Sequence, residues 1–264
     1  MEKHISSVQN PWIKKLVQIQ EKSKERKKSG LFLVEGVREV SIALQAGYEI
    51  ESLIYCPELT DKQNADVVLS QIAEKQRVSV TKEVYQKLAY REKTEGIIAL
   101  GHAKKHDLEG LELPENPLIL VAESIEKPGN IGALLRTADA AAVDAVILAD
   151  PKTDLYNPNV VRSSVGGVFT NQIATASSMQ VIDFLKEKNI AIFSAILQEA
   201  EDYSLQNYKQ GSAIVVGTEA TGLSEVWREH STQHIIVPME GIIDSMNVSV
   251  AASILIFEAK RQRR

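Results

Sequence analysis

Polar residues and glycines gather at three places in the carboxyl-terminal half of the chain, each after an apolar run typical of a buried strand. The three stretches are EKPGNIGALLRTADA (126–140), IVVGTEATGLS (214–224) and PMEGIIDSMNVSV (238–250). The carboxyl ends of parallel strands meet at one edge of a sheet, and open α/β folds bind their ligands at that edge. The sequence therefore predicts that the three stretches converge on a ligand site.

The first stretch combines an amide with a cationic side chain. Asn130 stands where the N-cap of a helix belongs. Arg136 lies one helical turn from Gly132 and from Ala140, and these small neighbours let a ligand or another backbone come close. Helical side chains lean toward the amino terminus, which directs the guanidinium back toward Asn130. The alternatives are a plain cap at Asn130 and a surface ion pair between Arg136 and Asp139.

The second stretch is a turn that holds an acid between two glycines. Gly217 ends a predicted strand, and Gly222 permits a tight or left-handed turn, with Glu219 between them. The pattern lacks the Gly-Lys-Ser/Thr of a phosphate-binding loop and the GxGxxG of a dinucleotide site. The alternative role of Glu219 is to complement the dipole of the following helix.

The third stretch leads into the last helix of the chain. Ser245 is the expected N-cap of a helix that starts near Met246, and Asn247 falls in its first turn. The free N–H groups of a helix start favour an oxyanion or a carboxylate. Capping alone explains Ser245 but leaves Asn247 without a role. The helix is apolar on nearly every face, and an oligomer interface would bury such a helix.

The surrounding sequence alternates strand and helix patterns. The first hundred residues indicate a small α/β domain, and residues 103–117, rich in charge and proline, are the best linker candidate. Beyond them, continuous apolar strands between helices predict a mainly parallel sheet covered on both faces. The expected strands are 31–36, 50–56, 77–81, 96–101, 118–122, 145–149, 172–176, 190–196, 213–217 and 234–238; the expected helices are 10–20, 37–47, 64–76, 82–90, 131–142, 178–188, 223–230 and 246–262.

Composition limits the classes of protein that are possible. The chain of 264 residues has no apolar run near the ~20 residues of a membrane span, and its start lacks a signal peptide's apolar core. We therefore expect a cytoplasmic protein. Its net charge is −5, yet residues 1–30 hold eight Lys and Arg against three Glu. This segment is either a solvated helix face or a contact for a phosphate backbone.

Taken together and in this order, the three stretches resemble motifs one, two and three of the SpoU/TrmH family of RNA ribose 2′-O-methyltransferases, within the SPOUT superfamily. The matching segments are KPGNIGALLRTADAAAV, VVGTEATGLS and IIVPMEGIIDSMNVSVAASILIFEA, so the resemblance covers about residues 117–262. LFLVEGVREVSIALQAG and TEGIIAL are similar to the substrate-binding domain of these enzymes, which has a ribosomal-protein-like fold. One departure is Met246, where many members have a leucine of similar volume.

The resemblance implies a fold, a cofactor and an assembly. A methyltransferase domain over 117–264 would have its sheet tied in a deep trefoil knot. An RNA substrate-binding domain over 1–105, with a basic helical arm at 1–30, would be joined to it by a linker over 106–116. The implied cofactor is S-adenosyl-L-methionine without a metal, and the implied assembly is a homodimer formed through the final helix.

The resemblance also assigns roles to single residues. The cofactor is expected to touch Gly217, Val237 and Met246 through main-chain groups, with Thr218, Ile236 and Pro238 nearby. The residues expected to line the catalytic site are Asn130, Arg136, Glu219, Ser245 and Asn247. Arginine's pKa above about 12 argues against Arg136 as a free base, so we expect it to stabilise the developing alkoxide and a neighbouring phosphate.

The expected activity is methyl transfer to a ribose 2′-hydroxyl. A separate amino-terminal domain favours a structured target such as ribosomal RNA, with tRNA second. One alternative is a catalytically silent RNA-binding or ribosome-assembly protein of the same fold. The other is a Rossmann-type methyltransferase acting on a small molecule, which would need a glycine-rich loop that LILVAESIEKPGN does not offer.

Overall fold

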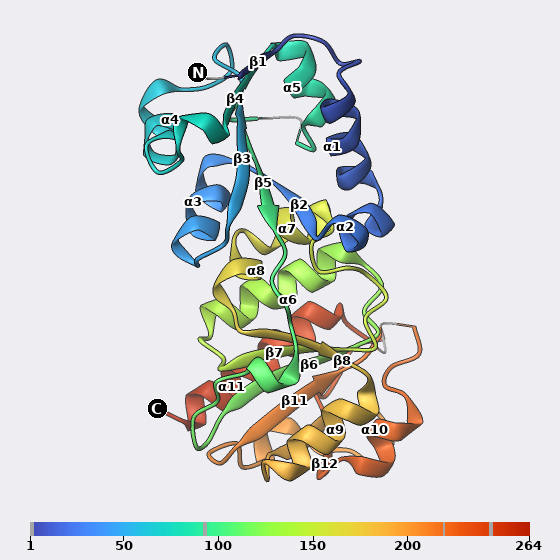
Figure 1. Cartoon of the computed structure of the whole chain (residues 1–264). Coiled ribbons are helices and arrows are strands. Elements are labelled where there is room, and N and C mark those ends of the chain that lie inside the picture. Colours follow the sequence, from blue (N-terminus) through green and yellow to red (C-terminus); the bar gives the residue numbers. More distant parts are fainter. Residues whose placement is uncertain (1–2, 92–93, 219, 243–244) are drawn as a thin grey trace. The chain divides into compact units, whose positions relative to one another are not determined.

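The computed structural model describes residues 3–91, 94–218, 220–242 and 245–264. The chain forms two compact units (Figure 1). Unit 1 comprises Met1–Lys104 together with Asp154–Thr170, and unit 2 comprises Lys105–Thr153 together with Asn171–Arg264. Within the described ranges, no helix is both long enough and apolar enough to cross a membrane. The expected functional boundaries of the domains and the expected trefoil knot stay predictions.

Unit 1 is built on a five-stranded mixed sheet in the order β1-β4-β3-β5-β2. β1, β4 and β3 are parallel, and β5 runs antiparallel to both β3 and β2. The strands are β1 (Lys3–Ile5), β2 (Leu31–Glu35), β3 (Ile50–Tyr55), β4 (Arg77–Val80) and β5 (Ile97–His102). The helices from its first 104 residues are α1 (Pro11–Glu21), α2 (Ser23–Ser29), α3 (Val37–Gln45), α4 (Lys62–Leu69) and α5 (Lys82–Leu88), with a short 3₁₀ turn, η1 (Glu74–Gln76).

The basic opening segment is folded into the core of unit 1. The Asn10 side chain caps α1 by accepting a hydrogen bond from the Trp12 N–H at 2.9 Å. The apolar spacing of α1 then buries Ile13, Leu16 and Ile19 against the sheet. The exposed lysines of α1 and α2 lie on the opposite, solvated side of these helices, and their expected contact with RNA stays a prediction.

Arg26 is the exception among the basic residues of this segment, because it is buried. Its guanidinium forms a bidentate ion pair with the Asp154 carboxylate, at 3.0 Å for Nε and 2.7 Å for Nη2. The remaining nitrogen donates to the carbonyls of Ile19 and Gln20, at 2.7 and 2.6 Å. All three guanidinium nitrogens therefore donate inside the protein, and the side chain is buried away from an RNA ligand.

Asp154 introduces a segment that the sequence did not predict to be helical. Residues Asp154–Thr170 carry α7 (Pro158–Ser164) and α8 (Gly167–Thr170), and both belong to unit 1. The Tyr156 ring stacks on Phe32 with centroids 4.1 Å apart, and Phe169 meets Tyr48 edge-on at 5.0 Å. The chain therefore passes between the units three times: after residues 104, 153 and 170.

Unit 2 contains a seven-stranded sheet, and every strand pair in it is parallel, which confirms the predicted fold class. The strand order is β10-β12-β9-β11-β6-β7-β8. The strands are β6 (Leu118–Glu123), β7 (Ala145–Ala149), β8 (Ile173–Ala176), β9 (Ala191–Ala195), β10 (Glu201–Asp202), β11 (Ser212–Val216) and β12 (Gln233–Ile236). The helices are α6 (Pro128–Ala140), α9 (Ser178–Glu187), α10 (Glu225–His230) and α11 (Val248–Gln262), with 3₁₀ turns η2 (Leu108–Gly110) and η3 (Tyr203–Leu205).

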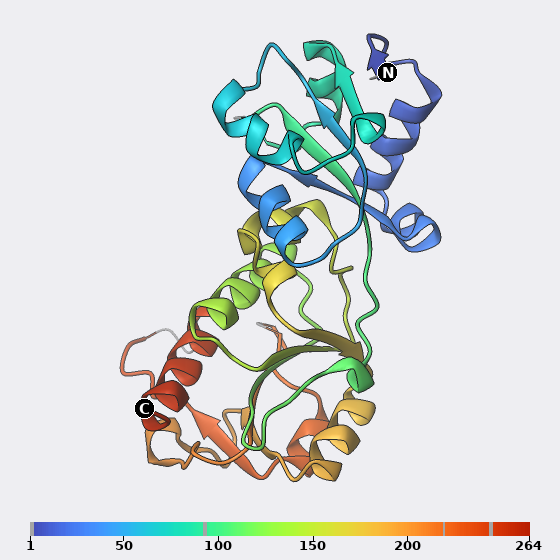
Figure 2. The ribbon, with the colours of Figure 1, turned by 60° about the vertical axis from the view of Figure 1, so that its left-hand side comes forward.

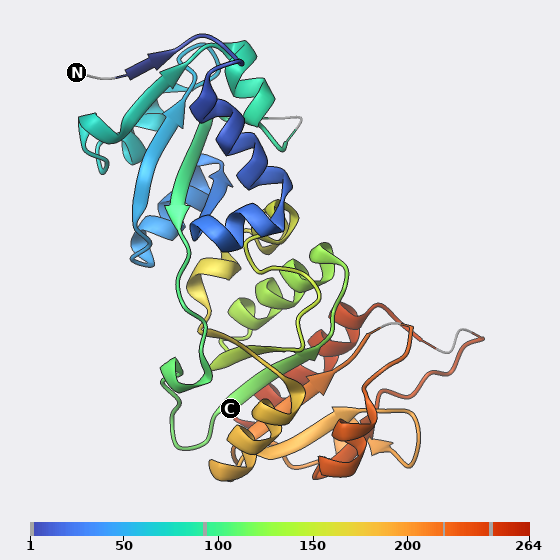
Figure 3. The same cartoon turned by 45° about the vertical axis from the view of Figure 1, so that its right-hand side comes forward.

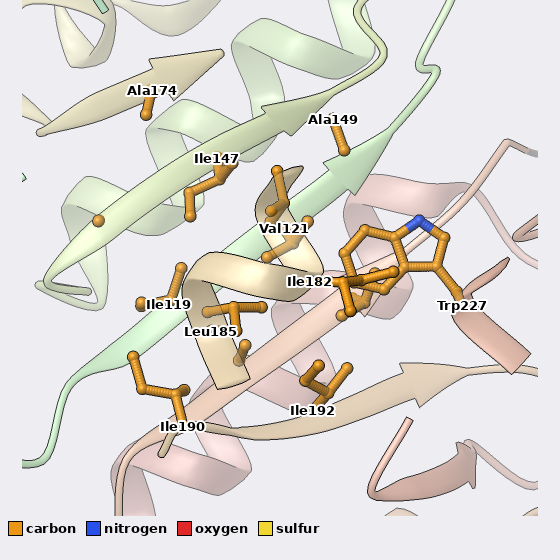
Figure 4. Packing of buried hydrophobic residues seen from close by; sticks show 14 of the residues in the cluster. Ile119, Val121, Ile147, Ala149, Ala174, Ile182, Leu185, Ile190, Ile192 and Trp227 are labelled. Atoms are coloured by element: carbon orange, nitrogen blue, oxygen red, sulfur yellow. The ribbon is translucent and has the colours of Figure 1, made fainter. Parts of the chain in front are cut away.

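Helices cover both faces of this sheet. Ile182 and Leu185 of α9 and Trp227 of α10 pack on one face, against the strand residues labelled in Figure 4. On the other face α6 and α11 lie side by side (Figure 2), joined by a 3.0 Å hydrogen bond between the hydroxyls of Thr137 and Ser253. The core therefore fixes the positions at which both α6 and α11 begin.

Residues 106–116, expected as a linker, are packed rather than free. Leu108 is buried in the hydrophobic core of unit 2, and Leu111 and Leu113 pack against it. The carbonyl of His106 accepts a hydrogen bond from the Thr175 N–H at 2.7 Å, which attaches the segment to β8. The charged and proline-rich composition hid these three leucines.

Two helix starts differ from the predictions. α6 begins at Pro128, so Asn130 is its third residue and not its N-cap; proline is pre-organised for the first helical position. α11 begins at Val248 with Asn247 as its N-cap, so Ser245 does not cap it. Both corrections change what the polar side chains at these sites can do.

We expect Arg26→Ala to lower the free energy of unfolding of unit 1 by about 3 kcal/mol, because it leaves the Asp154 carboxylate, only 11% exposed, without its partner. Lys27→Ala, on the same helix but exposed, is the matched control and should stay within about 0.5 kcal/mol of the parent. Urea denaturation followed by far-UV circular dichroism compares the two. Equal stabilities would show that the ion pair contributes nothing.

Candidate active site

A cavity of about 370 Å³ lies within unit 2, at the carboxyl edge of its sheet. Its walls come from the ends of β9, β11 and β12 with the residues that follow them, and from α11 with the residues before it. Figure 3 shows the backbone of these elements, coloured from orange to red. Ligand cavities in proteins are typically roughly 300–1,000 Å³ and lined mostly by apolar groups, and this one fits both criteria. The predicted convergence at this edge is therefore confirmed for the second and third stretches.

Most residues expected to touch a cofactor line this cavity. Gly217, Thr218, Ile236, Val237 and Met246 are all in its wall. Pro238 is not itself in the wall but stands between Val237 and Met239, which both are.

Gly217 is required by a close approach of two backbone segments. A Cβ at this position would overlap with the carbonyl group of Gly222. The hydrogen bonds between Thr218 and Gly222, at 3.1 and 3.0 Å, close a tight loop, and Gly222 itself has a φ of +66°. The spacing of the two glycines in the sequence is therefore explained by the structure: Gly217 and Gly222 lie against each other at the base of the loop, which we call its neck.

A second cavity, of about 400 Å³, adjoins the first. Four described residues, Thr218, Ala220, Thr221 and Val248, line both cavities. Asn130 and the residues before α6 complete the second cavity. The first stretch therefore meets the other two at this shared wall.

A hydrogen bond joins the first and third stretches directly. The Asn247 Nδ2 atom donates to Asn130 Oδ1 at 3.2 Å, across 117 residues of sequence. The Oδ1 atom of Asn247 accepts from the N–H and the hydroxyl of Ser249, at 2.9 and 2.6 Å, and so caps α11. One amide thus fixes the helix start and ties it to α6. Ser245 is exposed and lines the first cavity instead.

Arg136 is exposed on α6 and lines neither cavity. Within the described ranges, its guanidinium makes no hydrogen bond or ion pair, so the alternative ion pair with Asp139 is not formed. Glu219 and Asp244 lie outside the described residues. The structure therefore places Asn130 and Ser245 in the cavity walls and ties Asn247 to Asn130, while Arg136 lies outside both walls with an exposed cation that is unpaired among the described residues.

Glu123, which the sequence did not single out, is buried at the end of β6 beside the loop of the second stretch. Its carboxylate accepts hydrogen bonds from the N–H and hydroxyl of Ser224, at 2.8 and 2.5 Å, and from the Ser178 hydroxyl at 3.0 Å. Ser178 also accepts from the Trp227 indole at 3.1 Å. Because Ser224 precedes α10 and Ser178 begins α9, the negative charge lies at two helix starts, where dipoles favour it.

Arg228 was also not anticipated, and it is the one charged side chain among the described residues of the first cavity's wall. Its Nε atom is buried without a hydrogen bond, and a Glu225 carboxylate oxygen lies 3.7 Å from it. The only sequence signal was its position on the short helix after the second stretch. Such a cation suits a ligand that carries a carboxylate.

A parallel α/β unit with an apolar cavity at its carboxyl edge, walled by loops and the start of a helix, defines an enzyme-like site for a small organic ligand. Residues 117–257 match the model of the SpoU rRNA methylase family, and residues 10–99 match that of the MRM3-like substrate binding domain. The first match covers more than half of the chain, so the chain belongs to the SpoU rRNA methylase family.

Known relatives are similar over nearly the whole chain. The Bacillus subtilis 23S rRNA (guanosine(2553)-2′-O)-methyltransferase RlmP is 27% identical over 258 residues, which cover 98% of this chain and 99% of RlmP. A crystal structure of an RNA 2′-O ribose methyltransferase is 38% identical with a TM-score of 0.86, over 98% of this chain and 99% of that one. The AviRb methyltransferase of Streptomyces viridochromogenes, in complex with AdoMet, is 25% identical with a TM-score of 0.90, over 97% and 98%.

We expect Gly217→Ala to force the neck of the Thr218–Gly222 loop apart and to lower the free energy of unfolding of unit 2 by about 1–3 kcal/mol, because the added methyl group meets backbone atoms that cannot turn away. Gly241→Ala is the matched control, since a Cβ there would have open space around it. Urea denaturation of both variants measures the difference. A Gly217→Ala protein as stable as the control would mean that the neck is not closed in solution.

Proposed function

We propose that this chain is an S-adenosyl-L-methionine-dependent RNA methyltransferase that methylates a ribose 2′-hydroxyl of ribosomal RNA in the cytoplasm. The observation that carries the proposal is the pair of adjoining cavities with a shared wall, where three separate stretches meet and Asn247 binds Asn130. The relatives named as 23S rRNA 2′-O-methyltransferases support ribosomal RNA over tRNA.

The first cavity fits S-adenosyl-L-methionine in size and chemistry. Its wall is apolar apart from a few polar side chains, which suits an adenine ring, and its neck at Gly217 brings main-chain groups within reach of a ligand. The main-chain groups of Gly217, Val237 and Met246 would hold the cofactor, with Thr218, Ile236 and Pro238 near it and Arg228 available for its carboxylate. When bound, the cofactor supplies an electrophilic methyl group on a sulfonium.

The second cavity, with its wall at Asn130 and Thr218, would receive the ribose. The Asn130–Asn247 pair presents amide groups next to the start of α11, whose free N–H groups and dipole favour negative charge. Ser245 adds a hydroxyl at the edge of the first cavity. Holding the two reactants in line in this way can lower a barrier by roughly 7–11 kcal/mol.

Arg136 would stabilise negative charge and would not act as a base. A guanidinium stays protonated at neutral pH because its pKa is above about 12. Its exposed and unpaired cation is instead suited to stabilise the alkoxide that develops on the 2′-oxygen and the phosphate next to it. The proton would leave through that phosphate or through water. Glu219 would orient Arg136 or Asn247 from the loop between Thr218 and Ala220.

We also propose that the protein acts as a homodimer through α11. One face of α11 is buried in unit 2 by Val248, Ala252, Leu255, Ile256 and Ala259. A second apolar stripe is formed by Val250 and Phe257, which are 50% and 45% exposed, with the partly buried Ile254 between them. The spacing of i, i+4 and i+7 is that of a helix–helix contact face. This supports the prediction that a second subunit accounts for the all-round apolar character of the helix.

The domain roles follow from the same proposal. Residues 1–105 would bind the RNA substrate, together with the Asp154–Thr170 segment that folds with them. Residues 117–264 would carry out methyl transfer, and residues 106–116 would connect the two while packing on unit 2.

We expect Arg136→Ala to slow single-turnover methylation of ribosomal RNA by about 10²–10³-fold, because a preorganised charge is lost from the transition state. Arg136→Lys should restore only part of the rate, since it keeps the charge without the planar fork. Asp139→Asn, one turn along α6 and also exposed, is the control and should react normally. Cofactor binding, measured by calorimetry, should be equal in all four proteins; near-normal turnover by the alanine variant would refute the role of Arg136.

The dimer is tested with Phe257→Glu, which places a charge in the exposed apolar stripe of α11. We expect sedimentation to show a monomer for this variant and a dimer for the parent. Met179→Glu is the matched control, because Met179 is an exposed apolar residue of unit 2 on α9, and it should leave the dimer unchanged. A dimeric Phe257→Glu protein would move the interface elsewhere.

A further inference from the structure

Tyr90 in unit 1 is firmly held and yet left in solvent. Its side chain is 46% exposed, although its own backbone N–H and that of Arg91 are hydrogen-bonded. A carboxylate oxygen of Glu35 accepts hydrogen bonds from the N–H groups of Tyr90 and Arg91, at 2.8 and 3.0 Å. Leu88, two residues earlier, is buried in the core. A large aromatic ring that is exposed on a fixed backbone can bind a partner without first being ordered.

A cation stands over the Tyr90 ring. The Arg162 guanidinium carbon lies 5.6 Å from the ring centroid, which is within the range of a cation–π contact. Arg162 is exposed, and it is steadied by a 3.2 Å hydrogen bond from Nη2 to Asn159 Oδ1, one turn earlier on α7. The cation therefore comes from the segment of the chain that follows β7, although Tyr90 belongs to the first hundred residues.

The basic helices of unit 1 adjoin this pair. Gln20, in the last turn of α1, donates to the Leu88 carbonyl at 2.6 Å and lines the same small cleft as Tyr90 and Arg162. The exposed lysines Lys22 and Lys24 follow it directly in the chain. The surface next to the Tyr90 ring therefore continues into the most basic part of the sequence.

Two described carboxylates close to Tyr90, those of Glu35 and Glu39, are engaged by the protein itself. One Glu35 oxygen is used by two backbone amides, and the other is buried. Glu39 pairs with Arg91 at 2.6 Å and is itself buried. Of the described charged groups in contact with Tyr90 or its ring, Arg162 is therefore the one that stays exposed to an incoming polyanion.

We propose that Tyr90 and Arg162 form a nucleotide platform that binds an unpaired base of the RNA substrate. The base stacks on the exposed part of the Tyr90 ring, and the guanidinium of Arg162 contacts an adjacent phosphate. Stacking on an aromatic ring beside cations is how proteins hold unpaired nucleotides, whereas a protein partner would favour a wider apolar patch. This inference rests on the proposed function, because it takes RNA as the substrate.

The experiment measures fluorescence anisotropy of two labelled RNA probes with the full-length protein: a single-stranded 12-mer of uridine and a fully paired 12-base-pair duplex. We expect Tyr90→Ala to weaken binding of the single strand roughly tenfold and to leave duplex binding nearly unchanged, since one stacked base is lost. Tyr90→Phe should bind like the parent. Arg162→Gln should weaken binding of the single strand and lower the slope of log affinity against log salt by about one.

Val67→Ala is the matched control, because Val67 is an exposed apolar residue of unit 1 on α4. Equal single-strand affinity of Tyr90→Ala and the parent would overturn the platform, and so would an equal loss for the duplex, which would indicate contact with paired RNA. Calorimetric titration with S-adenosyl-L-methionine and methylation of ribosomal RNA by the parent separate the two proposals. A parent that binds RNA through Tyr90 but transfers no methyl group would refute the function and keep the platform.

Discussion

The candidate site depends on one constraint: parallel strands end at the same edge of a sheet, so the residues that follow them are brought together. In unit 2 this places the segments after β6, β9, β11 and β12 around two adjoining cavities. The Asn247 amide then makes the arrangement specific, because it caps α11 with its oxygen and reaches Asn130 with its nitrogen. Glu123 adds a further fixed point, because its carboxylate binds Ser224, two residues after the Thr218–Gly222 loop, to the buried end of β6.

The elements of unit 2 could be predicted largely from the sequence, because fully buried parallel strands are continuous apolar runs and are hard to mistake. The starts of α6 and α11 could not. Asn130 was the predicted cap of a helix over 131–142, although Pro128 also fits the first turn of a helix. Ser245 and Asn247 are residue types that both cap helices. Asn247 is the residue that caps α11, and the same side chain also donates a hydrogen bond to Asn130. No local pattern reveals a contact between residues so far apart in the sequence. For the same reason the partners of Glu123 could not be foreseen.

The basic segment at the start of the chain shows how charge divides between structure and surface. Arg26 is committed to Asp154 and to two carbonyl groups, while the lysines around it face solvent. A count of charges treats Arg26 and these lysines alike. Only the fold shows that Arg26 stabilises unit 1 while the lysines are accessible to a polyanion. The residues after β7 show the same limit: Tyr156 and Phe169 have no periodicity of their own, and their aromatic partners Phe32 and Tyr48 lie more than a hundred residues earlier.

The threefold passage of the chain between the two units has a consequence for how such proteins can be shortened or recombined. Unit 1 cannot be removed by deleting Met1–Lys104 alone. Asp154–Thr170 would remain, and its apolar side chains would lose the residues of unit 1 against which they now pack. Gly166, at a φ of +99°, packs so closely against Ile42 that a Cβ at this position would lie 2.6 Å from that side chain, and this constraint would lose its reason without unit 1. A version of this protein limited to unit 2 would therefore need a new connection between β7 and β8 in place of Asp154–Thr170, and not only the removal of residues 1–104.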